Sequence, residues 1–250
     1  MHSTRRARRT HSLDHARAAN IKVTTMTDLN SMKIILASGS ARRKEIFEAH
    51  GFTPVIMPMD VDETLPEDIT PQDAVMYLSL KKGLACREFL LSGDGSGQLS
   101  ASEHALIVSA DTIVYAKDIT TGRWTIMGKP KDEDDAWRML KSIASTSHKV
   151  MTGVTLISYT PASDADTAMD ADSASGSHIF RTFYDSTDVY VKPLSDEEIK
   201  AYIDSGEPFG KAGGYAIQMA FGKYIDHIEG DYENVVGFPY NHMIKEIESL

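Results

Sequence analysis

The chain has 250 residues with 42% apolar and 25% charged content, which predicts a soluble globular protein large enough to bury a sizeable core. No apolar run approaches the ~20 residues that span a bilayer, so we expect no transmembrane helix and no membrane partner. The formal net charge of −10 argues against a nucleic-acid partner, because duplex binding depends on clustered cations that neutralise phosphates.

Residues 1–31 differ in charge from the rest of the chain. They carry six basic side chains against two acidic ones, whereas residues 32–250 hold 20 basic and 34 acidic residues. The segment has no apolar core, so it is not a secretory signal. We expect a basic, disordered extension over 1–31 and a folded domain over 32–250. An organelle transit peptide and a true start at Met26 or Met32 stay open as alternatives.

The first part of the folded domain predicts alternating strands and helices. Ser40 follows an apolar run and a polar turn, as the N-cap of a helix does, and Pro71 suits the first turn of a longer helix. In chain order, the elements expected up to residue 91 are a strand over 33–37, a helix over 42–50, a strand over 52–58 and a helix over 71–91.

Residues 105–117 form the most informative predicted strand. Two apolar runs flank Ser109-Ala110-Asp111-Thr112, and no Gly, Pro or Asn is present to turn the chain. A carboxylate inside a buried strand is costly unless a cation or a metal ion pairs with it. Asp111 is therefore a candidate general base or metal ligand, and the alternative is a turn at Ala110-Asp111 that leaves the carboxylate in water.

The second half continues the alternation, which predicts an α/β fold. Residues 160–177 carry four aspartates, no basic residue and much Ala and Ser, so we expect a disordered acidic insert there. Ser195 and Glu198 form a capping-box pattern. The remaining elements are expected as a strand over 124–127, a helix over 132–144, strands over 149–159 and 179–191, a helix over 195–205 and a last helix from about 239.

Two segments have the composition of ligand-binding loops. Ser38-Gly39-Ser40-Ala41-Arg42-Arg43 turns a strand into a helix, where free backbone N–H groups and guanidinium groups favour phosphate. Lys211–Gln218 contains paired glycines that permit close approach to a ligand, and the Gln218 amide suits the edge of a base. Taken singly, the first segment is more typical of a capped helix with solvated arginines, and the second of a plain turn before a strand.

Other polar residues give weaker signals. Glu63, Lys82, Lys129 and Lys211, taken one at a time, are typical of surface charges. The histidines lack the spacing of a zinc site. The single cysteine, Cys86, excludes an internal disulfide and a cysteine-based zinc site, and we interpret it as a buried apolar residue of a cytoplasmic protein.

An ordered series of segments resembles the Maf family of nucleotide pyrophosphatases. The resemblance covers roughly residues 32–250, which is nearly all of the chain beyond the basic extension. The segments that carry it are Leu36–Glu45, Asp62-Glu63-Thr64, Ser109–Val114, Gly128-Lys129-Pro130, Met151–Val154, Lys211–Gln218, Gly230-Asp231-Tyr232 and Asn234–Pro239.

The resemblance implies a mixed twisted sheet with flanking helices, in two lobes around a central cleft, similar to inosine-triphosphate pyrophosphatases. It also implies a divalent cation, Mg²⁺ or Mn²⁺, and a homodimer. In this family the aspartate at the position of Asp111 is the proposed proton acceptor. The combination of Arg42, Thr112 and Gln218 resembles the base-reading residues of the branch that acts on dTTP and UTP. The expected phosphate-binding residues are Ser38, Ser40, Arg43, Lys82, Lys129 and Lys211, and the expected metal ligands are Glu63 and Asp111.

The sequence departs from the family pattern at two site positions. Ala41 replaces the usual proline, and Met219 replaces the usual glycine after Gln218, where it borders the expected base pocket. Two other functions stay open on the sequence alone. One is a non-catalytic, nucleotide-sensing regulator of cell division, and the other is a pyrophosphatase for modified purine nucleotides.

Overall fold

The structure is a computed structural model that describes residues 29, 31–93, 104–159 and 178–249. The expected basic extension, apart from Leu29 and Ser31, lies outside these residues, as does the expected acidic insert over 160–177. No helix in the described part of the chain is long and apolar enough to cross a membrane.

The described residues form an α/β fold around one mixed sheet, which confirms the predicted fold class. Two 3₁₀ turns, η2 (Ala212–Gly214) and η3 (Ala220–Tyr224), follow α5. The remaining elements, in chain order, are β1 (Lys33–Leu36), α2 (Ala41–Ala49), β2 (Val55–Ile56), α3 (Pro71–Leu91), β3 (Ala105–Lys117), β4 (Trp124–Met127), α4 (Glu133–Ile143), β5 (Ser147–Tyr159), β6 (His178–Val191), α5 (Asp196–Asp204), β7 (Ile225–Glu229), α6 (Tyr232–Val236) and α7 (Tyr240–Glu248).

Local signals placed most elements correctly. The helix over 71–91 and the strands over 105–117 and 124–127 have the predicted bounds, and Ser40 and Ser195 cap their helices as expected. The alternative of a turn at Ala110-Asp111 is wrong, because β3 is continuous. Four details differ: β2 is only two residues long, residues 211–218 lead into a 3₁₀ turn instead of a strand, and neither β7 nor α6 was predicted.

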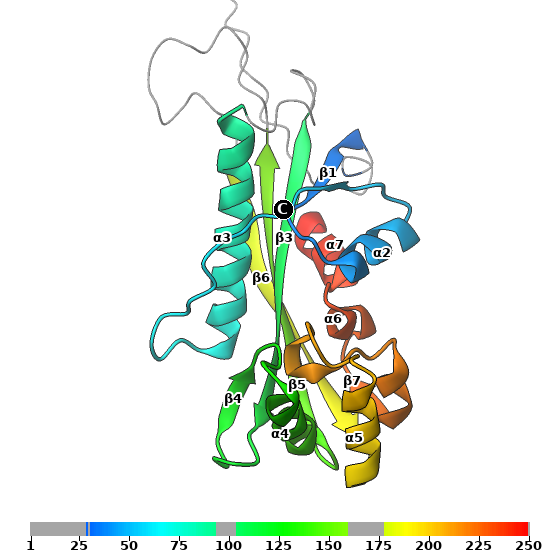
Figure 1. Cartoon of the computed structure of the whole chain (residues 1–250). Helices are drawn as coiled ribbons and strands as arrows, with labels where there is room; N and C mark the ends of the chain where they lie inside the picture. The colour runs from blue at the N-terminus through cyan, green and yellow to red at the C-terminus, as the bar shows by residue number, and fades with distance from the viewer. Residues whose placement is uncertain (1–28, 30, 94–103, 160–177, 250) are drawn as a thin grey trace, which may run out of the picture.

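The sheet has the strand order β2-β1-β3-β5-β6-β7, and β4 pairs with β3 beyond β1. β2, β1 and β3 run parallel, while β4, β5, β6 and β7 add antiparallel pairings. In Figure 1 the long strands β3, β5 and β6 run along the molecule, with α3 on one side and α2, α6 and α7 on the other. α4 and α5 lie at the far end beside β4 and β7, so the strands join two helical lobes.

Side chains of β3 alternate between the two faces of the sheet, as a strand requires. Leu106 and Val108 belong to a buried cluster with α2 and α7, whereas Ala105 and Ile107 belong to one with α3. Further along, Val114 and Ala116 join the cluster formed by α4 and α5. Each lobe therefore has its own apolar core, and β3 passes through both.

One edge of β3 is interrupted midway. β1 pairs with residues 105–108 of β3 and β4 pairs with residues 114–117. On this edge, residues 109–113 have no strand partner within the described ranges. Polar side chains in this gap can reach a common space from both faces of the sheet.

A glycine brings α3 close to the sheet. A Cβ atom added at Gly153 in β5 would lie 2.2 Å from the carbonyl oxygen of Val75 and 2.3 Å from its carbonyl carbon, both in the backbone of α3. The direct contact between α3 and β5 therefore requires a glycine at this position of the segment Met151–Val154. Lys82 lies on the same face of α3 as Val75, about two helical turns later.

We expect Gly153→Ala to destabilise the fold by about 1–3 kcal/mol, because the new methyl group forces α3 away from β5. The urea midpoint of unfolding measures this loss. Gly128→Ala is the matched control, since an added Cβ there has no heavy atom within 4 Å and no positive φ to strain. Equal midpoints for the two variants would contradict the contact.

Candidate active site

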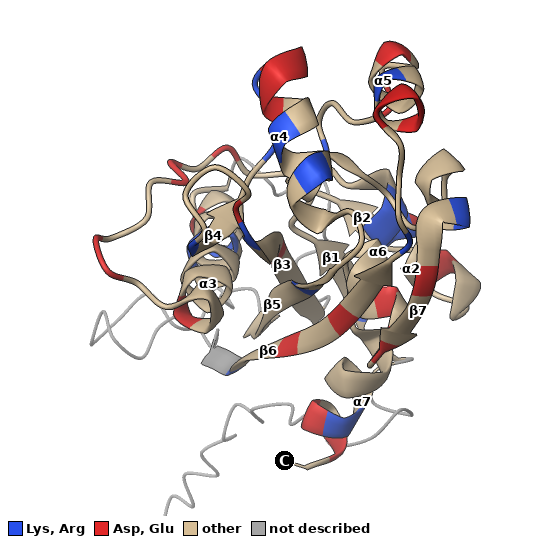
Figure 2. Ribbon diagram, turned by 90° about the horizontal axis from the view of Figure 1, so that it is seen from below, with Lys and Arg blue, Asp and Glu red and all other residues tan. Residues whose placement is uncertain are grey.

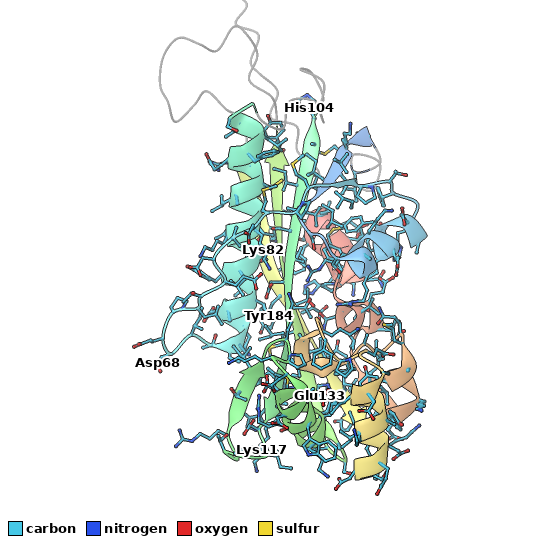
Figure 3. The ribbon with its side chains drawn as sticks, viewed as in Figure 1. Asp68, Lys82, His104, Lys117, Glu133 and Tyr184 are labelled. Carbon is cyan, nitrogen blue, oxygen red and sulfur yellow. The ribbon has the colours of Figure 1, made fainter. Side chains whose placement is uncertain are left out.

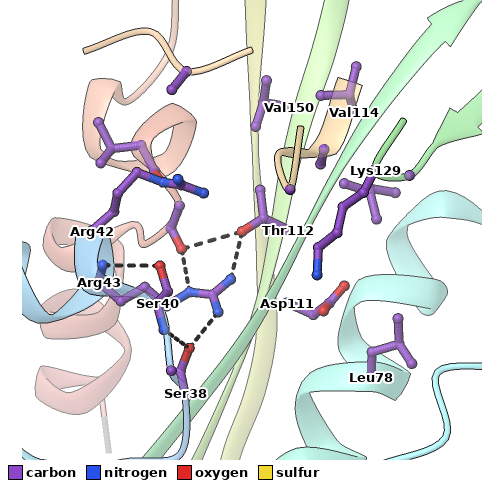
Figure 4. A pocket seen from close by; sticks show the side chains of 18 of the residues that line it. Ser38, Ser40, Arg42, Arg43, Leu78, Asp111, Thr112, Val114, Lys129 and Val150 are labelled. Atoms are coloured by element: carbon purple, nitrogen blue, oxygen red, sulfur yellow. Dashed lines mark hydrogen bonds between the residues drawn. The ribbon is translucent and has the colours of Figure 1, made fainter. Parts of the chain in front are cut away.

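A cavity of about 700 Å³ opens at the interrupted edge of β3. It lies between the two lobes and is bordered by the loop before α2, the 128–130 turn, the segment 210–218 and the segment 235–237 (Figure 4). The predicted site residues that line it are Ser38, Ser40, Arg42, Arg43, Glu63, Lys82, Asp111, Thr112, Lys129 and Gln218.

Asp111 forms a buried ion pair with Lys82. The Lys82 ammonium Nζ lies 2.6 Å from Oδ1 of Asp111 and 2.6 Å from Oε1 of Glu63. The side chains of Lys82 and Asp111 are only 14% and 12% exposed, whereas that of Glu63 is 54% exposed. Lys82 projects from the middle of α3 toward the strands (Figure 3). The hydrogen bond from Lys82 lowers the pKa of Glu63 below its usual value. The carboxyl groups of Asp111 and Glu63 thus share one cation, Lys82, at the wall of the cavity.

The loop between β1 and α2 holds Arg43 inside the site. Ser40 caps α2 by accepting a hydrogen bond from the backbone N–H of Arg43. Arg43 Nη1 donates to Ser38 Oγ at 2.8 Å, and its Nη2 donates to Thr112 Oγ1 at 2.9 Å (Figure 4). Burial lowers the pKa of Arg43 to about 10, and the nearby Asp111 carboxylate opposes this shift. The guanidinium is therefore charged at neutral pH.

The hydrogen bonds of Arg43 leave part of its guanidinium for a ligand. Its Nε donates to the carbonyl of Gly237 at 2.9 Å, so each of the three nitrogens has one protein partner. A guanidinium has five N–H bonds, and one on each terminal nitrogen stays free of these three contacts. Such a fork suits the oxygens of a phosphate.

Neighbouring residues of β3 point to opposite helices. Asp111 faces Lys82 of α3, and Thr112 faces Arg43 of α2. Both side chains line the cavity because this stretch of β3 has an open edge. Period-two alternation thus places a carboxylate and a hydroxyl against cations from the two sides of the sheet.

Two further cations complete the charge of the cavity. Arg42 Nε donates to the carbonyl of Val236 at 3.3 Å, and Lys129 follows β4 in the turn with Gly128 and Pro130. Positive charge from Lys82, Lys129 and Arg43 lowers the pKa of Glu63. Acidic residues, in contrast, are spread over α4, α5, β6 and β7 on the outside of the molecule (Figure 2). Four cations thus line the cavity of an otherwise acidic chain, as expected for a site that binds an anionic small molecule.

Lys211 does not have the predicted position. Its ammonium donates to the carbonyl of Glu207, and Lys211 is not one of the described residues that line the cavity. The 3₁₀ turn that starts at Ala212 directs the chain so that Ala212 and Gln218 face the cavity instead. A predicted phosphate contact from Lys211 is therefore not supported by the geometry.

Tyr215 lines the cavity and lies in the predicted loop Lys211–Gln218, but it was not one of the expected site residues. Its hydroxyl and Nε2 of His148 are 2.6 Å apart, and both side chains are buried. Burial lowers the pKa of His148 to about 3, so the ring is neutral at physiological pH. This contact ties the segment with Gln218 to β5. A distant histidine in one strand and a tyrosine in a loop give no local pattern that predicts their pairing.

The carboxylates suit a divalent ion that is shared with a ligand. No cluster of three or more His, Cys, Asp or Glu side chains occurs among the described residues. The Asp111 and Glu63 oxygens that contact Lys82 lie within two hydrogen-bond lengths of each other. Mg²⁺ is commonly held by one or two carboxylates, water molecules and the phosphates of a substrate. The donor set fits that arrangement.

Comparison with known proteins identifies the family. Residues 33–250 match the family model described as Maf, Maf-like protein. A dTTP/UTP pyrophosphatase of Agathobacter rectalis is 38% identical over 219 residues, which are 87% of this chain and 97% of that protein. A dTTP/UTP pyrophosphatase of Bacillus cereus is 38% identical over 221 residues, 88% of this chain and 91% of that protein.

Among solved structures, the Staphylococcus aureus Ham1 protein aligns with a TM-score of 0.35 and 10% identity, covering 64% of this chain and 71% of that one. The family model spans both lobes and every residue of the cavity. The chain belongs to the Maf family.

Proposed function

We propose that this protein is a nucleoside triphosphate pyrophosphatase that hydrolyses dTTP and UTP to the monophosphate and pyrophosphate. Relatives named dTTP/UTP pyrophosphatase, which align with most of the chain, support the reaction and the substrates. The observation that carries the proposal is the position of Asp111, a buried carboxylate that faces a cavity lined by four cations.

The cations bind the triphosphate in this proposal. Arg43 offers its two free N–H bonds, while Lys82 and Lys129 approach from the opposite side of the cavity. Ser38 and Ser40 lie in the loop before α2 and line the cavity. Backbone N–H groups at the start of a helix also favour phosphate. Most of the rate enhancement comes from positioning and from charge stabilisation, as is usual for phosphoryl transfer.

Asp111 accepts a proton from the attacking water. The water oxygen forms a bond with the α-phosphorus, and the bond from this phosphorus to the α,β-bridging oxygen breaks. The water proton moves to the Asp111 carboxylate, and pyrophosphate leaves with the bridging oxygen. Lys82 stabilises the charged carboxylate before the proton arrives, because its ammonium is 2.6 Å from Oδ1.

A divalent cation, Mg²⁺ or Mn²⁺, belongs to this proposal as a cofactor. Asp111 and Glu63 are the residues that would hold it, together with phosphate oxygens of the substrate. When bound, it neutralises negative charge on the phosphates during the reaction.

Base selection is assigned to three residues around the cavity. Arg42, Thr112 and Gln218 all line it, and they enter from α2, β3 and the segment after η2. Gln218 offers both a donor and an acceptor, which suits the edge of a pyrimidine. Met219 lies next to it and is 48% exposed, so a bulky side chain stands where the family commonly has glycine.

We also propose a cellular location and an oligomeric state for the enzyme. We place the enzyme in the cytoplasm, since its single cysteine, Cys86, excludes an internal disulfide and a reducing compartment is then the default. A homodimer follows from the family resemblance, and sedimentation velocity at several concentrations measures it.

The substrate assignment is tested by pyrophosphate release from a panel of canonical and methylated nucleoside triphosphates. We expect dTTP and UTP to be the best substrates, with activity in Mg²⁺ or Mn²⁺ that is abolished by a chelator and restored by metal. Equal rates on all bases would refute the pyrimidine assignment. A preference for modified purines would support the alternative substrate, and nucleotide binding without release would support the sensing alternative.

Asp111→Asn should lower turnover about 10²–10⁴-fold, because general-base catalysis contributes that much and the amide cannot accept the proton. The variant keeps the shape of the side chain, so its circular dichroism spectrum should match that of the wild type. Near-normal turnover would refute the role of proton acceptor. Recovery of the lost activity at high metal concentration would instead assign Asp111 chiefly to metal binding.

A further inference from the structure

The segment Asn234-Val235-Val236-Gly237, which is the C-terminal end of α6 with its capping glycine and is here called the 234–237 turn, lies against both site arginines. The carbonyl of Val236 accepts from Arg42 Nε at 3.3 Å, and the carbonyl of Gly237 accepts from Arg43 Nε at 2.9 Å. Thr112 Oγ1 also donates to the carbonyl of Gly237 at 3.3 Å. The backbone of this turn therefore fixes one nitrogen of each guanidinium.

Asn234 anchors the turn to the sheet. It is fully buried, and its Nδ2 donates to the carbonyl of Val150 in β5 at 3.0 Å and to Thr187 Oγ1 in β6 at 2.9 Å. The carbonyl of Asn234 accepts from Thr152 Oγ1 at 3.2 Å. The side chain thus holds the start of the turn against two neighbouring strands.

Thr187 in β6 hydrogen-bonds both Asn234 and Asp231. Its hydroxyl donates to the carbonyl of Asp231 at 3.0 Å and accepts from the Asp231 N–H at 3.1 Å, in addition to the Asn234 amide. One donated and two accepted bonds exhaust a hydroxyl. Gly230 precedes this contact with φ +133°, and a Cβ there would lie 3.0 Å from Thr187 Cα. The segment Gly230–Asn234 therefore approaches β6 closely at Thr187.

We propose that Thr187 and Asn234 are positioning residues for the two arginines of the active site. Thr187 lies in β6 and is not one of the described residues that line the cavity. It acts through Asn234 and the carbonyls of the 234–237 turn. Displacement of this turn moves both guanidinium groups together. Misplacement of about 1 Å at a reacting site can cost roughly 100-fold in rate.

The matched pair Thr187→Val and Thr187→Ser isolates the hydroxyl. Valine keeps the shape of threonine without the hydroxyl, whereas serine keeps the hydroxyl without the methyl group. This inference rests on the proposed function, so kcat and KM for dTTP and UTP are measured in the wild type and both variants. We expect Thr187→Val to lower kcat/KM about 10–100-fold on both substrates, and Thr187→Ser to retain most of it.

A second measurement separates positioning from stability. Pyrophosphate inhibition should weaken in Thr187→Val and stay near the wild-type value in Thr187→Ser, since Arg43 binds the phosphates. All assays are run well below the melting temperature of each variant. A lower melting temperature with unchanged kcat/KM would overturn the proposal, and so would equal losses of kcat/KM in the two variants.

Failure of the proposed function is distinguishable from failure of the positioning role. If the wild type releases no pyrophosphate, the proposed reaction is wrong. The affinity for inorganic tripolyphosphate, measured by calorimetry, then reports on the position of Arg43 without any turnover. Weaker binding by Thr187→Val than by Thr187→Ser supports positioning, and equal binding overturns it. If Thr187→Val does not fold, Thr187→Cys, with a thiol that bonds only weakly, takes its place in the same comparison.

Discussion

The buried ion pair between Asp111 and Lys82 is the interaction on which the rest of the site depends. A carboxylate in the middle of a strand loses its hydration, and the cost is large unless a cation offsets it. The ammonium of Lys82 lies 2.6 Å away and supplies that charge. It can do so because α3 packs directly on the sheet, with the backbone of Val75 against Gly153. The packing of α3 on the sheet therefore also determines where the Lys82 charge lies in the site.

The strand β3 explains why the cavity lies where it does. It runs through the apolar cores of both lobes, and its partners β1 and β4 leave residues 109–113 open on one edge. Because side chains alternate, Asp111 meets α3 and Thr112 meets α2. Arg43 then links β3 to the loop before α2 and to Gly237 near the C-terminus. The cavity walls come from distant parts of the sequence, and their polar contacts converge on this short stretch.

Local patterns predicted what depends on neighbouring residues. The absence of turn-forming residues around Asp111 predicted a continuous strand, and the serine caps predicted the start of α2 and of α5. Contacts across the fold had no such signal. Lys82 alone is typical of a surface charge, and only the register of α3 on the sheet brings it to Asp111. Lys211 has a promising place beside paired glycines, yet the 3₁₀ turn after it points its amine to Glu207.

The most direct test is a crystal structure with magnesium and an α,β-imido analogue of dTTP, in which the bond to be cleaved is resistant to hydrolysis. We expect an ordered water about 2.6–3.2 Å from a carboxylate oxygen of Asp111, opposite the bridging nitrogen and facing the α-phosphorus. The phosphates should contact Arg43 and Lys129. A bound analogue with its base, and not its α-phosphate, beside Asp111 would contradict the role of Asp111 as proton acceptor.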